Sequence, residues 1–176
     1  MDADLKQVHE YLRVIEKELI AGNATEHTHR PALKTLVEGL AKGIIATNEP
    51  QRTECGAPDF LVTKGVFQVG YIEAKDVSKS LDEAEKSEQL KRYRDSLPNL
   101  ILTDYLEFRW YVDGDLRCPS ACLGTLTKDG KIKRDKAGVQ AVAELLNEFL
   151  ALKAEAVGTP KELAKRMART LGTQAP

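Results

Sequence analysis

The hydrophobic residues of this chain follow a helical spacing over several long stretches. Between residues 3 and 20 they recur at steps of three and four, at Leu5, Val8, Leu12, Ile15 and Leu19. This spacing places them on one face of an α-helix. A second stretch repeats the pattern, with Leu33, Leu36, Val37, Leu40 and Ile44. We therefore predict helices over residues 3–20 and 31–45, and further helices over 80–97, over 137–153 and from Pro160 onward.

Shorter segments rich in β-branched and aromatic residues lie between these helices. Residues 60–65 and 66–74 are predicted as two strands joined around Lys64-Gly65, and residues 99–104 as a short buried strand. A second hairpin, with strands over 106–112 and 115–126, is predicted across Asp113-Gly114, a dipeptide that favours a tight turn. This order of elements predicts an α/β fold, in which a mixed central β-sheet is flanked by helices on both faces.

The composition is that of a globular domain. The chain has 176 residues, of which 42% are hydrophobic and 30% charged, and its formal net charge is −1. This length suffices for one domain with a hydrophobic core, and the small net charge gives no overall attraction to nucleic acid or to membranes. The three cysteines, Cys55, Cys118 and Cys122, are too few for a disulfide framework, which favours a reducing cytoplasm. No apolar run is long enough to cross a bilayer, and the N-terminus lacks the pattern of a signal peptide.

Charged side chains flank the first predicted hairpin. Asp59 follows Pro58 just before the first strand, and Glu73 and Lys75 lie at the end of the second. Because alternate side chains of a strand point to the same face, Glu73 and Lys75 share one face, while Ala74 faces the core. Pairing of the two strands brings Asp59 beside Glu73. A Glu-x-Lys triplet also arises by chance about once in a couple of hundred residues, so the triplet alone carries little weight.

Two neighbouring carboxylates form the kind of site that binds a divalent cation. Asp59 and Glu73 repel each other, and burying either without a partner is unfavourable. Mg²⁺ takes carboxylate and carbonyl oxygens and keeps several of its waters; Mn²⁺ could replace it, and the carbonyl of Ala74 is a further candidate ligand. A metal-bound water loses its proton more readily, and Lys75 could orient it or stabilise developing negative charge, which suits attack on a phosphodiester.

The motifs in this region resemble those of a known family. Pro58-Asp59 followed by Glu73-Ala74-Lys75 resembles the signature of the PD-(D/E)XK nuclease superfamily. Gln89 and Tyr93 resemble the Gln-x-x-x-Tyr element of its RecB-like branch. With the stretches TEHTHRPAL, NEP, GAPDF and LILTDYLEFRWY, the chain is similar to the N-terminal nuclease domain of single-chain restriction-modification enzymes, Type IIG or Type I-like.

This resemblance implies a role for each matching residue. Asp59 and Glu73 would bind the metal, and Lys75 would assist the attacking water. Gln89 and Tyr93 would orient Lys75 or contact the DNA backbone. Glu26 matches the upstream acidic residue of the family, which helps to hold a metal or its water.

The resemblance also implies a larger context. Residues 1–155 would form a restriction-endonuclease-like core, and residues 156–176 would begin a helical connector to a methyltransferase and target-recognition domains. The partner would be double-stranded DNA, with a second nuclease copy needed for a double-strand break. The expected products carry a 5′-phosphate and a 3′-hydroxyl. No membrane partner is expected.

Other interpretations of the same residues stay open. A free-standing repair exonuclease or resolvase of the same superfamily is one alternative, and a non-catalytic interaction domain on this fold is another. The residues KRYRD around Tyr93 form either a phosphate-contacting edge or a solvated helix face. Arg30 either pairs with a carboxylate near the site or caps its loop. His27 and His29 are expected in a solvated loop or cap, and Cys118 and Cys122 as two small buried residues.

Overall fold

A computed structural model of the chain describes residues 2–22, 24–50, 55–77 and 79–152, and for Glu26 it describes the main chain alone. The predicted helical connector, residues 156–176, lies outside the described residues, as does the predicted helix from Pro160.

The first two predicted helices are present. Helix α1 spans Asp2–Ile20, and a short 3-10 helix, η1 (Glu26–His29), leads into α2 (Arg30–Leu40). The prediction that the second helix continues to residue 45 is wrong, because Ala41 is extended and Gly43 has a φ of +82°. Ile44 instead opens strand β1 (Ile44–Asn48), which buries it in the same core as α2. The apolar pattern therefore continues from helix into strand without a visible break.

The central sheet is mixed, as predicted. Its strand order is β1-β2-β3-β4-β5-β6, and β7 also pairs with β5. Strands β3 and β4 run parallel, whereas the other neighbours run antiparallel. The strand bounds after β1 are β2 (Phe60–Lys64), β3 (Phe67–Ala74), β4 (Asn99–Thr103), β5 (Glu107–Val112), β6 (Asp115–Leu116) and β7 (Ala121–Cys122).

The parallel pair requires a crossover, and two short helices provide it. The single helix predicted over residues 80–97 is wrong: the segment forms α3 (Leu81–Glu85) and α4 (Glu88–Ser96). Ser87 separates them, because its side chain accepts a hydrogen bond of 3.2 Å from the main-chain N–H of Leu90 and so caps α4. Arg109 on β5 ties α3 to the sheet through ion pairs of 2.7 Å with Asp82 and 2.8 Å with Glu85.

The segment predicted as one strand over residues 115–126 is divided into three pieces. After β6 and β7 the chain forms β8 (Gly124–Leu126), which pairs with β9 (Ile132–Arg134) in a separate two-stranded hairpin. Helix α5 (Lys136–Ala151) follows, and its cap Asp135 accepts a hydrogen bond of 3.0 Å from the N–H of Ala137. The predicted helix over 137–153 is therefore confirmed within about two residues at each end.

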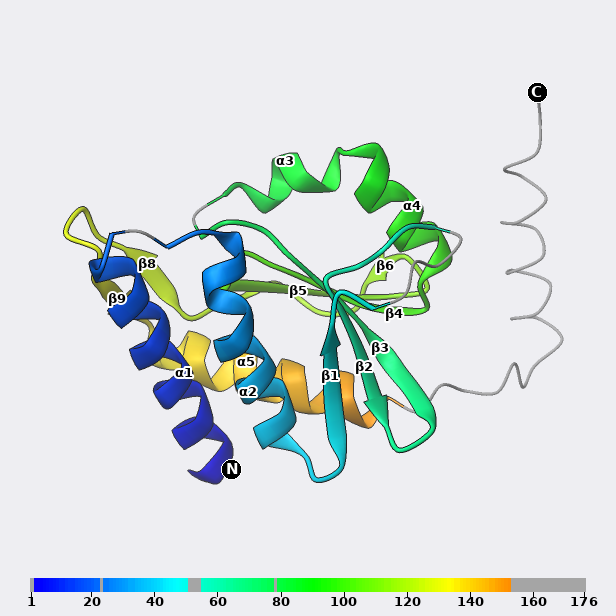
Figure 1. Cartoon of the computed structure of the whole chain (residues 1–176), viewed down its shortest axis with the longest axis horizontal. Helices are drawn as coiled ribbons and strands as arrows, with labels where there is room; N and C mark the ends of the chain where they lie inside the picture. Colours follow the sequence, from blue (N-terminus) through cyan, green and yellow to red (C-terminus); the bar gives the residue numbers. More distant parts are fainter. Residues whose placement is uncertain (1, 23, 51–54, 78, 153–176) are drawn as a thin grey trace, which may run out of the picture.

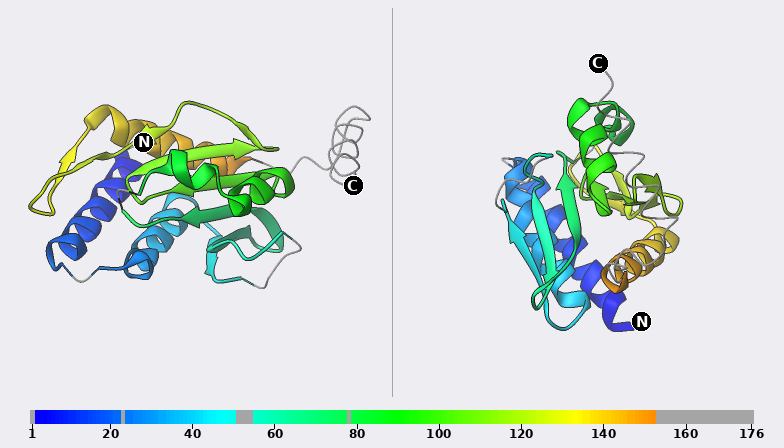
Figure 2. Two further views of the ribbon diagram at one scale, coloured as in Figure 1. Left: turned by 90° about the horizontal axis from the view of Figure 1, so that it is seen from above. Right: turned by 90° about the vertical axis from the view of Figure 1, so that its right-hand side faces the viewer.

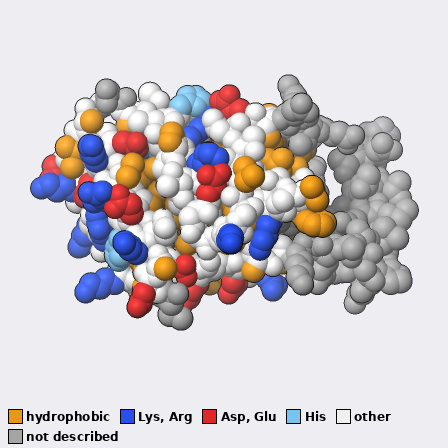
Figure 3. Space-filling model, turned by 60° about the horizontal axis from the view of Figure 1, so that its bottom comes forward, with side chains coloured by type: hydrophobic (Ala, Val, Ile, Leu, Met, Phe, Trp, Pro, Cys, Tyr) orange, Lys and Arg blue, Asp and Glu red, His pale blue; other side chains and the backbone are white. Residues whose placement is uncertain are grey.

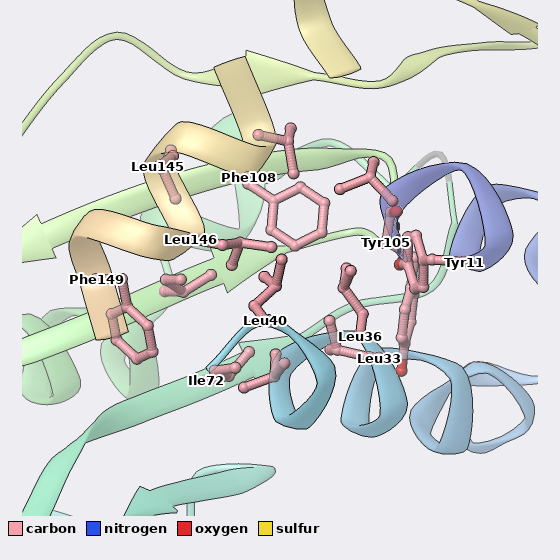
Figure 4. Close-up of a cluster of buried hydrophobic side chains, with 14 of the residues drawn as sticks. Tyr11, Leu33, Leu36, Leu40, Ile72, Tyr105, Phe108, Leu145, Leu146 and Phe149 are labelled. Carbon is pink, nitrogen blue, oxygen red and sulfur yellow. Dashed lines mark hydrogen bonds between the residues drawn. The ribbon is translucent and has the colours of Figure 1, made fainter. Parts of the chain in front are cut away.

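The helices cover both faces of the sheet. Helices α1, α2 and α5 lie on one face, and α3 and α4 lie on the other (Figures 1 and 2). The larger core joins helices α1, α2 and α5 to the sheet, through side chains such as Leu36, Ile72, Phe108 and Phe149 (Figure 4). The smaller core joins Leu90 and Tyr93 of α4 to Tyr71 and Leu100 of the sheet. Among the described helices, none is both long and apolar enough to span a bilayer.

Candidate active site

Asp59 and Glu73 meet where β2 and β3 pair at one end of the sheet. The register pairs Phe60 with Ile72, so the preceding residue, Asp59, lies opposite Glu73. The main-chain N–H of Asp59 donates to Oε2 of Glu73 at 3.3 Å, and that of Ala74 donates to Oδ2 of Asp59 at 2.8 Å. The two carboxylates that the sequence singled out are thus held side by side by backbone donors.

The alternation of β3 decides which face carries the charges. Ile72 and Ala74 lie in the larger core, on the side of α1, α2 and α5. Tyr71 lies in the smaller core with Tyr93, so Glu73, two residues further along, faces the α3–α4 side. The side chain of Glu73 is only 4% exposed there. The predicted separation of the charged and apolar faces is confirmed.

Lys75 completes the group at the end of β3. Its Nζ donates a hydrogen bond of 2.7 Å to Oε1 of Glu73, and its side chain is 18% exposed. The N–H of Lys75 donates to the carbonyl of Thr103 at 2.8 Å, which continues the β3–β4 pairing one residue past the strand. The position of Lys75 is therefore fixed by the parallel part of the sheet.

Arg30 enters the site from the first residue of α2. Its guanidinium pairs with Oδ1 of Asp59 and donates 2.9 Å to Oε1 of Glu49. The side chain is only 7% exposed. The sequence left open whether Arg30 pairs with a carboxylate or caps its loop, and the structure shows the pairing. This contact spans 29 residues, so no local pattern could reveal it.

Gln89 and Tyr93 lie one turn apart on α4. Nε2 of Gln89 donates to the Tyr93 hydroxyl at 3.1 Å, and Tyr93 is buried while Gln89 is exposed. Burial raises the pKa of Tyr93, and the negative charges of Glu73 and Asp59 add to that shift. The phenol therefore lies within electrostatic range of both carboxylates. Among the described residues, neither Gln89 nor Tyr93 is hydrogen bonded to Lys75, and their predicted role stays a prediction.

The electrostatics of the site are dominated by Glu73. Burial, followed by the negative charge of Asp59, raises the pKa of Glu73 from 4.5 to about 7, although Lys75 acts in the opposite direction. With this pKa, the protonated and ionised forms of Glu73 are both present in the metal-free protein near neutral pH. A bound cation would favour the ionised form.

The donor set fits a hard divalent cation. Mg²⁺ is usually bound through one or two carboxylates and keeps several waters, so Asp59 and Glu73 suffice as its side-chain ligands. Among the described residues, no three His, Cys, Asp or Glu side chains stand together as a metal-binding group. This is unlike a structural zinc site, which takes four ligands. The side chain of Glu26 lies outside the described residues, so its predicted contribution stays untested.

Other polar residues and cysteines lie outside the group formed by Asp59, Glu73 and Lys75. His29 is the N-cap residue of α2, but it is buried rather than solvated, and its Nδ1 lies 2.7 Å from Oε2 of Glu18. Asp104 accepts hydrogen bonds from the N–H groups of Leu106 at 3.0 Å and Glu107 at 2.6 Å, which closes a turn. The expectation that Cys118 and Cys122 are buried is wrong: Cys122 is exposed and Cys118 is partly buried.

Comparison with known proteins supports the fold. The chain is similar to a chain in the cryo-electron microscopy structure of a DrdV–DNA complex, with a TM-score of 0.65 and 23% sequence identity. The similarity covers 93% of the present chain and 15% of that chain, so the present chain spans a small part of its structural relative. No protein-family model and no curated protein matches the sequence. At this level of identity, the similarity shows a shared fold.

Proposed function

We propose that this chain is a divalent-metal-dependent DNA endonuclease domain of the PD-(D/E)XK type. The observation that carries the proposal is the convergence of Asp59, Glu73 and Lys75 at the end of β3, through hydrogen bonds of 3.3 Å and 2.7 Å. Two acidic groups and one ammonium on adjacent strands supply a cation site and a positive charge beside it. The fold shared with a chain of a DNA complex supports DNA as the partner, and we propose that this DNA is double-stranded.

Each of these residues would contribute to phosphodiester hydrolysis. Asp59 and Glu73, with the carbonyl of Ala74, would hold Mg²⁺ or Mn²⁺. When bound, the cation supplies a more acidic water and neutralises charge on the phosphodiester. Lys75 would orient the attacking water or stabilise the negative charge that develops on the phosphate. Tyr93, hydrogen bonded to Gln89, would orient Lys75 or contact the DNA backbone.

A local concentration of positive charge supports contact with DNA. The face seen in Figure 3 mixes charges of both signs with apolar side chains, in keeping with the net charge of −1. The hairpin of β8 and β9, residues 124–134, differs: it carries Lys128, Lys131, Lys133 and Arg134 against one acidic residue, Asp129. We call this hairpin the basic ribbon. Basic side chains on a projecting ribbon suit contact with phosphate oxygens.

The basic ribbon is attached to helix α1. The N–H of Ile132 donates 2.8 Å to Glu16 of α1. Glu18, further along the same helix, holds His29, which directly precedes Arg30. The ribbon therefore lies at the end of α1 where α2 begins (Figure 1). We propose that a duplex bound at the carboxylates extends past the start of α2 to the ribbon.

We further propose that the domain belongs to a restriction-modification enzyme. The small share of its structural relative that it spans, 15%, suits a module of a longer protein with methyltransferase and target-recognition domains. A second nuclease copy would complete a double-strand break. A free-standing exonuclease would differ in cutting only from DNA ends, and a non-catalytic domain would not cut.

The test is cleavage of a supercoiled plasmid in Mg²⁺ or Mn²⁺. We expect the wild-type chain, or the longer protein that contains it, to nick the plasmid, which has no ends. Asp59→Asn, Glu73→Gln and Lys75→Ala should each lower the rate by at least about 100-fold, because each removes a group needed for the cation or the developing charge. Lys64→Ala, at the far end of β2, is the matched charge control. Equal nicking by all four variants would refute the proposal.

A further inference from the structure

We propose that Arg30 is an internal counter-ion of this site: it holds Asp59 in the metal-free protein and opposes the binding of a divalent cation there. The proposal rests on the proposed function in one respect, that Asp59 and Glu73 are the cation ligands. It goes beyond it by assigning a positioning residue, which acts on the cation through Asp59.

The geometry shows that Arg30 forms a buried ion pair with Asp59. Its guanidinium pairs with Oδ1, while Oδ2 of the same carboxylate accepts the N–H of Ala74 at 2.8 Å. Both side chains are largely buried, with 7% exposure for Arg30 and 12% for Asp59. Each Asp59 oxygen is therefore held from a different element, α2 on one side and β3 on the other.

Arg30 also has a second anionic partner, Glu49, which it binds at the same time as Asp59. A second nitrogen of its guanidinium donates 2.9 Å to Glu49, whose side chain is 70% exposed. The backbone of Glu49 has a φ of +49°, and its N–H donates to the carbonyl of Asp59 at 2.8 Å. Glu49 and Asp59 thus present two neighbouring anionic acceptors to one guanidinium. When Asp59 turns to a cation, Arg30 keeps a charged partner.

The charges explain why a competition is expected. Asp59 pairs with Arg30 and Glu73 pairs with Lys75, so the formal charges of these four side chains balance when both carboxylates are ionised. A divalent cation enters as a third positive group and is repelled by Arg30. A unit charge acting on a divalent ion over roughly 6 Å changes its affinity about tenfold, even at the dielectric constant of water.

Arg30→Gln should therefore bind Mn²⁺ about tenfold more tightly than the wild-type chain, while cleaving DNA more slowly because Asp59 loses its orientation. The affinity is measured by calorimetric titration of the metal-free 176-residue chain with Mn²⁺, and repeated with Mg²⁺. Arg30→Lys keeps the charge and should retain an affinity near that of the wild type. Lys34→Gln is the matched control, since Lys34 lies one turn further along α2 and pairs with Glu38 instead.

The outcomes separate this proposal from the proposed function. Equal Mn²⁺ affinity in the wild type and Arg30→Gln, or equally tightened binding in Arg30→Lys, would overturn the counter-ion role and leave the cation site standing. Absence of Mn²⁺ binding at millimolar concentration in every variant would overturn the cation site, and the role of Arg30 with it. Circular dichroism on each variant shows whether the fold is kept. If Arg30→Gln does not fold, Arg30→Met takes its place in the same titration, with the same expected result.

Discussion

The main-chain N–H of Ala74 donates a hydrogen bond of 2.8 Å to the carboxylate of Asp59. Strand β2 begins at Phe60, so this bond extends the β2–β3 pairing beyond the strand by using a side chain in place of a carbonyl. The orientation of Asp59 is consequently set by strand register. A shift of register by one residue would move Glu73 to the opposite face of the sheet and separate it from Asp59.

The stability of the metal-free protein should fall with rising pH because of Glu73. Its pKa is raised from 4.5 to about 7 in the folded state. Below pH 4.5 the group is protonated in both states. Between the two values the unfolded chain releases its proton first, which favours unfolding, and above about 7 the loss is complete, at about 3 kcal/mol.

Urea unfolding with EDTA at several pH values checks this prediction. Wild type should lose about 3 kcal/mol more than Glu73→Gln between pH 4.5 and 8, because glutamine does not titrate. Adding Mg²⁺ at pH 8 should recover stability in the wild type alone, since a cation favours the ionised carboxylate. Parallel pH profiles for the two proteins would show that Glu73 is not responsible.

Gly56→Ala should disturb Tyr93 specifically. Gly56 has a φ of +134°, and a Cβ there would lie 2.9 Å from the ring of Tyr93 and 3.0 Å from its hydroxyl. Because the ring is buried against the sheet, it must shift, and the loss of stability should be on the order of 2–3 kcal/mol. Displacement of the phenol should also reduce cleavage several-fold.

Gly65→Ala is the matched control for this change. Gly65 also has a positive φ, +60°, but open space surrounds it at the β2–β3 turn. It should lose about 1 kcal/mol from backbone strain and cleave normally. Thermal unfolding and plasmid nicking compare the two variants, and equal nicking by both would argue against a role for the position of Tyr93.

Removing charge from the basic ribbon should weaken DNA binding. Lys131 and Lys133 are exposed on the ribbon. Affinity falls as salt rises, and replacing a lysine that touches a phosphate should make the slope of log affinity against log salt less steep by about one. The reason is that one fewer counter-ion is released on binding. We expect Lys131→Ala with Lys133→Ala to bind a labelled duplex about 3- to 10-fold more weakly at low salt. Fluorescence anisotropy in EDTA measures the affinity without cleavage.

A double variant of Lys6 and Lys42 to alanine provides the control. It removes the same charge from exposed positions near the opposite end of α1 and at the turn after α2. If both double variants lose affinity equally, the effect comes from net charge, and the ribbon has no particular role in binding.

The periodicity of the sequence predicted most of the elements, because the apolar face of a helix or strand is a local property. The errors occur where local patterns are ambiguous. Ile44 continues the stripe of α2 although it begins β1, since both elements bury it in the same core. Ser87 divides the helix predicted over 80–97, because its hydroxyl caps α4 in the middle of a helix-favouring run. Such boundaries depend on which of several possible capping residues ends or begins the helix in the folded chain.

For the candidate site, the sequence by itself determined that Glu73 and Lys75 share a face, because the side-chain period of a strand is two, and that a hairpin brings Asp59 near them. Only the tertiary structure decided that Arg30 pairs with Asp59 and that the Tyr93 phenol lies near both carboxylates. These contacts join elements far apart in the chain, and they are set by how α2 and α4 pack on opposite faces of the sheet. Local spacing carries no information about that packing.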